Sequence, residues 1–259
     1  MRMSPFGTLM AAKKSAAKKS PVKDSPVATS AKVAKKAKKT AITSREAVLA
    51  DACPLMAAII SVVGPCTMET KPKRAPYESL MRAVAHQQLH GKAAETILRR
   101  FCALYPGKKF PTPEDVQSTS LDALRSVGFS SAKALALKDI AEKALSGIVP
   151  SSRTIQKLSN EEIVERLTRV RGVGRWTVEM LLMFQLGRED VLPVDDFGLR
   201  HGLRVLRQNA GRKKDLPLPA PKELAAYGAR WSPHRTMASW YLWRAAERDR
   251  AMKQAEKKT

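Results

Sequence analysis

The sequence predicts an all-α fold on three observations. From about residue 45 onward, apolar residues recur every three or four positions, the periodicity of helices with one buried face. Runs of alternating β-branched residues are scarce, and no pair of segments is joined by hairpin-turn residues. Several of the periodic stretches are preceded by residues that typically cap a helix N-terminus.

The first expected helical stretch runs from Tyr77 to Tyr105, with a break near Gly91. The next helix is expected to begin at Pro113, a residue favoured in the first turn. Thr112 before it and Asp115 after it form a capping-box pattern, in which each side chain binds the backbone N–H of the other.

Further helices are expected over 121–127 and 132–145, on either side of a turn at 128–131. A second capping box at 159–162 opens a helix through Val170. A last long helix is expected to start at Ser232-Pro233 and run to about Lys253. The main loops are expected at 106–113 and 207–221, which are rich in Gly, Lys and Pro.

The composition excludes several classes of protein. The chain has 259 residues, a net charge of +23 and three cysteines. No apolar run is long enough to span a membrane. Three cysteines outside any C-x-x-C pattern argue against a disulfide framework and cannot supply a four-thiolate metal site. Such a positive charge predicts a polyanionic partner, and nucleic acid is the first candidate.

Residues 1–44 form a basic tail that contains eleven Lys or Arg and one acidic residue, Asp24. Because it is built mainly of Ala, Lys, Ser, Pro and Val, we expect the tail to be disordered. It is either a solubilising extension or a non-specific DNA tether; a targeting peptide fits its composition less well. The remaining residues, 45–259, still carry a net charge of +13. The nucleic-acid prediction therefore does not depend on the tail.

Gly172-Val173-Gly174 lies between two predicted helices, the second beginning near Arg175. The glycines permit a tight turn and a close approach of the backbone to another molecule. The free N–H groups of the second helix then form a phosphate site, flanked by the charges of Arg171 and Arg175. An ordinary helix C-cap would use the same residues.

Pro193-Val194-Asp195-Asp196 follows, with Asp196 twenty positions after Trp176. The acidic pair lies where a new helix would begin, and Asp is a good N-cap. Taken alone, this motif would indicate capping and nothing more.

Together, these motifs resemble the helix-hairpin-helix (HhH-GPD) glycosylase superfamily of base excision repair, and within it the 3-methyladenine DNA glycosylase II branch. The similarity covers about residues 75–245, and further matching segments lie at 83–90, 110–113, 124–128, 231–235 and 240–243. The resemblance implies a two-lobed helical bundle over residues 45–259, in the compact form of the family. It also implies an enzyme that flips an alkylated purine, of the 3-methyladenine or 7-methylguanine type, out of duplex DNA and excises it.

By this resemblance, Asp196 is the catalytic carboxylate that stabilises the oxocarbenium-like sugar and orients the attacking water. Asp195 is expected to cap the helix or contact the hairpin backbone. Trp176 stands where strand-nicking members carry a lysine, so we expect hydrolysis without a lyase step. No cysteine follows Asp196, so the iron–sulfur loop of the endonuclease III-like branch is missing.

The resemblance also assigns residues that hold the base and the DNA. Trp176, Trp243, Phe197 and Met180 are expected to line the base pocket, where indoles would attract a cationic alkylated purine. The best-known relative has a tyrosine in place of Met180. Trp231 and Trp240 are expected in the core. The expected DNA-binding residues of the hairpin are Gly172, Gly174, Arg171, Arg175 and Thr177. Those of a wedge loop are Gln87, Gln88, Leu89 and His90, and Gln88 or Leu89 is expected to fill the gap that the flipped base leaves in the base stack. A core-facing Leu89 and a solvated His90 are the alternative.

Three other functions remain open from the sequence: a non-catalytic helix-hairpin-helix DNA-binding module, a histone-like chromosome protein that uses the tail, and a glycosylase for another damaged base. We expect a monomer that binds double-stranded DNA, with no membrane association. We expect it to be intracellular, in the cytoplasm or nucleoid of a bacterium. No cofactor or catalytic metal is expected, although a structural monovalent cation at the carbonyls of 172–174 is left open.

Overall fold

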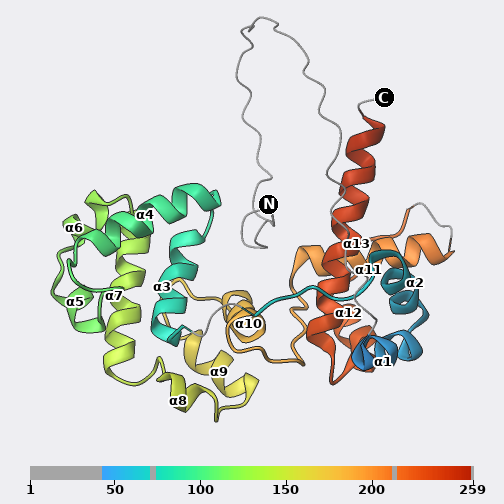
Figure 1. Ribbon diagram of the computed structural model, residues 1–259, viewed down its shortest axis with the longest axis horizontal. Coiled ribbons are helices and arrows are strands. Elements are labelled where there is room, and N and C mark those ends of the chain that lie inside the picture. Colours follow the sequence, from blue (N-terminus) through green and yellow to red (C-terminus); the bar gives the residue numbers. More distant parts are fainter. Residues whose placement is uncertain (1–42, 71–73, 212–214, 258–259) are drawn as a thin grey trace, which may run out of the picture.

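The computed structural model describes residues 43–70, 74–211 and 215–257. Within these residues the regular structure is entirely helical, which confirms the all-α prediction (Figure 1). One lobe contains α3 (Pro76–His86), α4 (Gly91–Ala103), α5 (Pro113–Ser118), α6 (Leu121–Ser126), α7 (Ser131–Leu145), α8 (Ser152–Ile155) and α9 (Asn160–Leu167). The other contains α1 (Ser44–Ala52), α2 (Pro54–Val63), α11 (Phe197–Gly211), α12 (Pro221–Gly228), the 3-10 helix η1 (Ala229–Trp231) and α13 (Arg235–Glu256). Helix α10 (Arg175–Phe184) lies between the lobes.

A single hydrophobic core extends through both lobes and includes Trp231 and Trp240, as expected. In the first lobe α7 packs against α3, α5 and α6, and in the second α13 packs along α11 and α2. The contact of α11 with α13 requires a glycine at position 202, because a Cβ there would lie 2.1 Å from the carbonyl oxygen of Leu242. This close packing fixes the second turn of α11 relative to α13.

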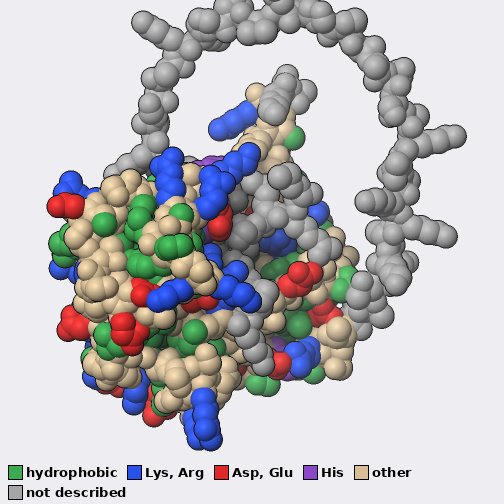
Figure 2. All heavy atoms as spheres, turned by 60° about the vertical axis from the view of Figure 1, so that its left-hand side comes forward, with side chains coloured by type: hydrophobic (Ala, Val, Ile, Leu, Met, Phe, Trp, Pro, Cys, Tyr) green, Lys and Arg blue, Asp and Glu red, His purple; other side chains and the backbone are tan. Residues whose placement is uncertain are grey.

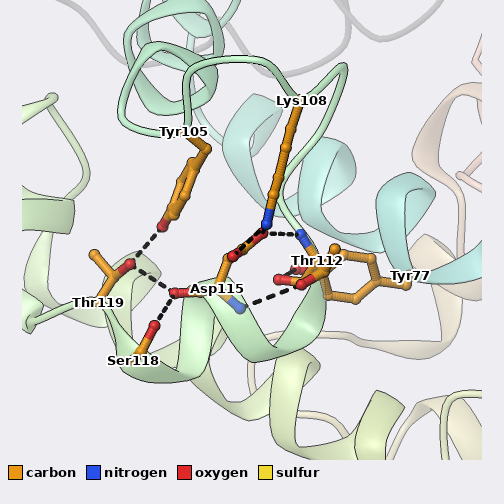
Figure 3. Close-up of polar contacts among 7 residues, drawn as sticks. All are labelled: Tyr77, Tyr105, Lys108, Thr112, Asp115, Ser118 and Thr119. Atoms are coloured by element: carbon orange, nitrogen blue, oxygen red, sulfur yellow. Dashed lines mark hydrogen bonds and ion pairs between the residues drawn. The ribbon is translucent and has the colours of Figure 1, made fainter.

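The predicted capping box of α5 is present (Figure 3). Asp115 Oδ2 accepts the N–H of Thr112 at 2.8 Å, and Thr112 Oγ1 accepts the N–H of Asp115 at 3.3 Å. Lys108 Nζ binds both carboxylate oxygens of Asp115 at 2.7 Å and lowers the pKa of that carboxyl. A second box at Ser159 opens α9, and the predicted break near Gly91 separates α3 from α4. These local signals were sufficient to locate the starts of α4, α5 and α9.

Several predicted boundaries are wrong. Residues 207–211 were assigned to a loop, but α11 continues through them to Gly211. The reason is tertiary, because Arg207 pairs with Glu223 and its guanidinium lies 4.8 Å from the ring centre of Tyr227, both on α12. Helix α9 was expected to reach Val170 but ends at Leu167.

The last helix begins at Arg235 and not at Ser232-Pro233. Ser232 does not act as its cap, because its hydroxyl donates to Asp190 Oδ2 at 2.8 Å. Asp190 Oδ1 instead accepts the backbone N–H of Arg235 at 3.3 Å and its Nε at 2.6 Å. The start of α13 is thus set by an acid far away in the sequence.

The proposed tail, residues 1–44, lies outside the described residues except for Thr43 and Ser44, with which α1 begins. On the described body, Lys and Arg side chains are spread over the face that comes forward in Figure 2, with Asp and Glu among them. None of the helices in the described ranges combines the length and apolar character of a membrane-spanning segment.

Candidate active site

Asp196 lies immediately before α11 and caps it. Its Oδ1 accepts the backbone N–H of Leu199 at 2.9 Å, and its carbonyl oxygen accepts that of Arg200 at 3.1 Å. The expectation that Asp195 caps this helix is wrong. Helix α11 begins at Phe197, so the N-cap position is that of Asp196. The side chain of Asp196 is only 3% exposed, whereas Asp195 is exposed.

Two indole N–H groups bind the carboxylate of Asp196 from two other helices. Trp176 Nε1 on α10 donates to Oδ2 at 2.7 Å, and Trp243 Nε1 on α13 donates to Oδ1 at 3.0 Å. With the N–H of Leu199, the carboxylate therefore accepts three hydrogen bonds. Three helices meet at this one side chain.

Gly198 allows Trp243 to approach the carboxylate. A Cβ at this position would lie 2.9 Å from Trp243 Cδ1 and 3.0 Å from Asp196 Oδ1. Only glycine fits between the two partners without moving one of them. The sequence reasoning missed this residue, although Gly198 directly follows the acidic pair and Phe197.

The other predicted pocket residues differ in exposure. Met180 and Trp243 are buried, and the ring of Phe184 stacks on Trp243 at a centroid distance of 6.0 Å. Trp176 is half-buried, whereas Phe197 is 58% exposed and stacks on His201 at 5.9 Å. Of the four predicted pocket residues, Trp176 and Phe197 are therefore the ones with exposed surface.

Glu179 is a second acid at this site that the sequence analysis did not identify. It lies on α10, one turn after Trp176, and its side chain is 6% exposed. Its Oε1 accepts Nε of Arg175 at 3.1 Å. Burial raises the pKa of Glu179 to about 7, and the charges of Asp195 and Asp196 add to the rise, while Arg175 opposes it. The sequence signal for this acid was that Glu179 is the single charged residue within the largely apolar segment 176–184.

The hairpin between α9 and α10 has the predicted turn. Gly172 adopts φ +76°, and Gly174 is the N-cap of α10 and offers no side chain to its N–H groups. Arg171 and Arg175 are exposed beside it. Thr177 was predicted to bind DNA, but it is 8% exposed, so it can offer little beyond its backbone N–H.

An open hollow of about 680 Å³ lies at the hairpin. Residues 168–174 line it together with Asp139 and Lys143 of α7. Lys143, Arg169 and Arg171 bring positive charge to this hollow, and Asp139 brings a negative charge. The Gly172 carbonyl, one of those considered for a cation, accepts Gln87 Nε2 at 2.8 Å.

The predicted wedge loop, residues 87–90, connects α3 to α4 next to the hairpin. Gln88 is exposed and has φ +56°, a left-handed conformation that is uncommon for a residue with a side chain. His90 is exposed, and Leu89 is half-buried and lies outside the main core. This geometry favours Gln88 over Leu89 as the projecting residue.

Comparisons with known proteins agree with this arrangement. The family model described as "HhH-GPD superfamily base excision DNA repair protein" matches residues 81–225. DNA-3-methyladenine glycosylase 1 of Schizosaccharomyces pombe is 45% identical over 176 residues, covering 68% of this chain and 74% of the relative.

Two solved structures are similar to more than three quarters of the chain. The S. pombe 3-methyladenine DNA glycosylase in complex with abasic DNA has a TM-score of 0.64 at 41% identity, covering 78% of this chain and 95% of the other. The DNA-3-methyladenine glycosidase of Bacillus halodurans has a TM-score of 0.68 at 33% identity, covering 79% and 89%. The chain belongs to the HhH-GPD superfamily of base excision DNA repair proteins.

Proposed function

We propose that this DNA glycosylase of base excision repair releases N-alkylated purines, of the 3-methyladenine and 7-methylguanine type, with Asp196 as its catalytic carboxylate. The observation that carries the proposal is the carboxylate of Asp196, held between the N–H groups of Trp176 and Trp243 at the start of α11. The names of the relatives support the alkylated-base substrate.

The proposed reaction breaks the bond between C1′ and the base nitrogen. The electron pair leaves with the base, and a base already positive from alkylation departs as a neutral molecule. The sugar becomes oxocarbenium-like, and Asp196 stabilises this charge at close range. A water oxygen, oriented by the same carboxylate, then bonds to C1′ and loses a proton, which leaves an abasic site.

We propose hydrolysis alone, without cleavage of the DNA strand. A lyase step needs an amine that forms a Schiff base with the sugar. At the position where the resemblance puts that lysine, this chain has Trp176, whose indole binds Asp196 and has no nucleophilic amine. The glycosylase II branch is proposed separately, on the resemblance of the sequence motifs.

Base recognition is proposed to involve Trp176, Trp243, Phe197 and Met180. Of these, Trp176 and the exposed Phe197 would contact the flipped base directly, since an electron-rich ring attracts a cationic purine. Trp243 and Met180 are buried and would form the floor of the pocket.

We propose that the hairpin holds a DNA phosphate and that the wedge loop enters the duplex. The phosphate would lie on the N–H groups of α10, between Arg171 and Arg175. Gln88 would occupy the space left by the flipped nucleotide, flanked by Leu89 and His90.

The remaining features are proposals of the same kind. The reaction requires water and no cofactor, and a monovalent cation at the hairpin stays a prediction. We expect the protein to act as a monomer in the compartment that holds the DNA. The basic tail is proposed to add non-specific affinity for it.

The test is to identify the products released from methylated duplex DNA. We expect free 3-methyladenine and 7-methylguanine by mass spectrometry, abasic sites that break only after alkali, and no covalent adduct on treatment with borohydride. Release of no base would contradict the proposed substrate, and an adduct trapped by borohydride would contradict the absence of a lyase step.

A further inference from the structure

One face of α7 contacts both segments that are proposed to bind DNA. Lys133, Ala136 and Asp139 are spaced by three residues and therefore lie along one side of the helix. Lys133 reaches the wedge loop, and Asp139 reaches the hairpin. Asp139 also lines the hollow at the hairpin, whereas Lys133 and Ala136 do not.

Lys133 binds the chain where α3 ends and the wedge loop begins. Its Nζ donates to the carbonyl oxygens of Ala85 at 3.0 Å and Gln87 at 2.8 Å. The last carbonyls of a helix have no partner within the helix, so the ammonium group satisfies them. The next residue, Gln88, is held in its left-handed conformation directly after this contact.

Asp139 binds the hairpin at the opposite end of the same face. Its Oδ2 accepts the backbone N–H of Arg171 at 2.6 Å, while its Oδ1 is held by Lys143 Nζ at 2.5 Å. Gly172 lies against Ala136, because a Cβ on it would be 3.3 Å from the Ala136 Cβ. The hairpin therefore rests directly on α7.

The loop and the hairpin also bind each other, through Gln87 Nε2 and the carbonyl of Gly172 at 2.8 Å. These contacts close a ring that runs from α7 through Lys133 to the wedge loop, on to the hairpin, and back through Asp139. Such a ring fixes the distance between the residue that enters the duplex and the turn that holds the phosphate.

We propose that Lys133 and Asp139 are positioning residues for base flipping, which keep the wedge loop and the hairpin in register on the DNA. The inference rests on the proposed roles of these two segments. Its consequence is selective: a gap in the base stack must be filled only when the lesion lies in a duplex. Loss of register should therefore impair excision from duplex DNA more than excision from a single strand.

The test uses one methylated oligonucleotide, both single-stranded and annealed to its complement, under single-turnover conditions. Lys133→Met keeps the aliphatic stem and removes the donor. We expect its rate on duplex DNA to fall about tenfold or more and its rate on the single strand to change less than twofold. Lys133→Arg, which retains N–H donors, should recover most of the duplex rate.

Lys138→Met is the matched control, because Lys138 lies on the same helix and donates to a carbonyl, that of Gln117, away from both DNA-binding segments. It should leave both rates within twofold of wild type. Equal losses on the two substrates for Lys133→Met, or a full duplex rate, would overturn the inference. A wild type that releases no base would instead refute the proposed function.

A second measurement does not depend on the excision reaction. 2-Aminopurine placed beside a stable abasic analogue in a duplex reports insertion of the loop through its fluorescence. Wild type and Lys138→Met should change this fluorescence equally, and Lys133→Met should change it much less at saturating protein. An unchanged response with Lys133→Met would contradict the positioning role even if excision were affected.

Discussion

Glu179 makes the stability of the protein depend on pH in a direction opposite to that of most carboxyl groups. Burial raises its pKa from 4.5 to about 7 in the folded state. Between these two values the unfolded chain loses the proton and the folded chain keeps it, so the free energy of unfolding falls as pH rises and levels off above pH 7. The rise of the pKa from 4.5 to about 7, at about 1.36 kcal/mol for a tenfold change in proton affinity, gives a loss of about 3 kcal/mol.

Glu179→Gln removes this titration and retains a group that can accept from Arg175. The variant should gain stability relative to wild type as pH rises from 4.5 to 8, by about 3 kcal/mol. The assay is urea unfolding of both proteins at four pH values across this range. Taking the difference cancels the other titrations, such as that of His201, whose lowered pKa acts in the opposite direction.

Glu165→Gln is the control, because Glu165 is an exposed glutamate that pairs with an arginine, Arg169, at the same four-residue separation as Glu179 and Arg175. Its difference from wild type should stay small across the same range. A difference for Glu179→Gln that is flat, or that falls as pH rises, would show that Arg175 keeps the buried carboxylate ionised and would refute the reasoning.

Three further predictions concern the site and the hairpin. Trp243→Phe removes one donor to the carboxylate of Asp196 and should lower the single-turnover rate about 10- to 100-fold, because a hydrogen bond to a charged group contributes about 1.5–3 kcal/mol. Trp240→Phe on the same helix should keep the wild-type rate, and equal rates for the two variants would contradict the prediction. Gly198→Ala should destabilise the fold by about 1–3 kcal/mol in urea unfolding and reduce excision, because its Cβ would displace Trp243; wild-type values for both would show that the contact is not needed. Arg171→Ala should weaken DNA binding and reduce the slope of log affinity against log salt by about one, and an unchanged slope in a fluorescence titration would exclude a phosphate contact.

The sequence was most informative where a structural feature depends on residues that are adjacent in the chain. The capping box of Thr112 and Asp115 and the turn at Gly172 are local, so their residue types were enough to predict them. The end of α11 was missed because it depends on the partners of Arg207 on α12, which no local pattern reveals.

In the candidate site, too, features set by tertiary contacts were missed. The resemblance brought Trp176, Trp243 and Asp196 together correctly, and the structure adds the hydrogen bonds that join them. Glu179 and Lys133 were missed, because a charged residue on a helix gains its role from what the fold places around it. The cap of α11 was assigned one residue too early, since Asp195 and Asp196 are equivalent until the first turn is seen.

The most direct test of the central claim is the single-turnover release of methylated purine from duplex DNA by wild type, Asp196→Asn and Asp195→Asn. Removal of one preorganised charge at a developing cation is expected to cost about 10²- to 10³-fold. We predict that loss for Asp196→Asn, with unchanged DNA binding, and a rate within a few-fold of wild type for the exposed neighbour. Full activity of Asp196→Asn, or a larger loss in Asp195→Asn, would contradict the account.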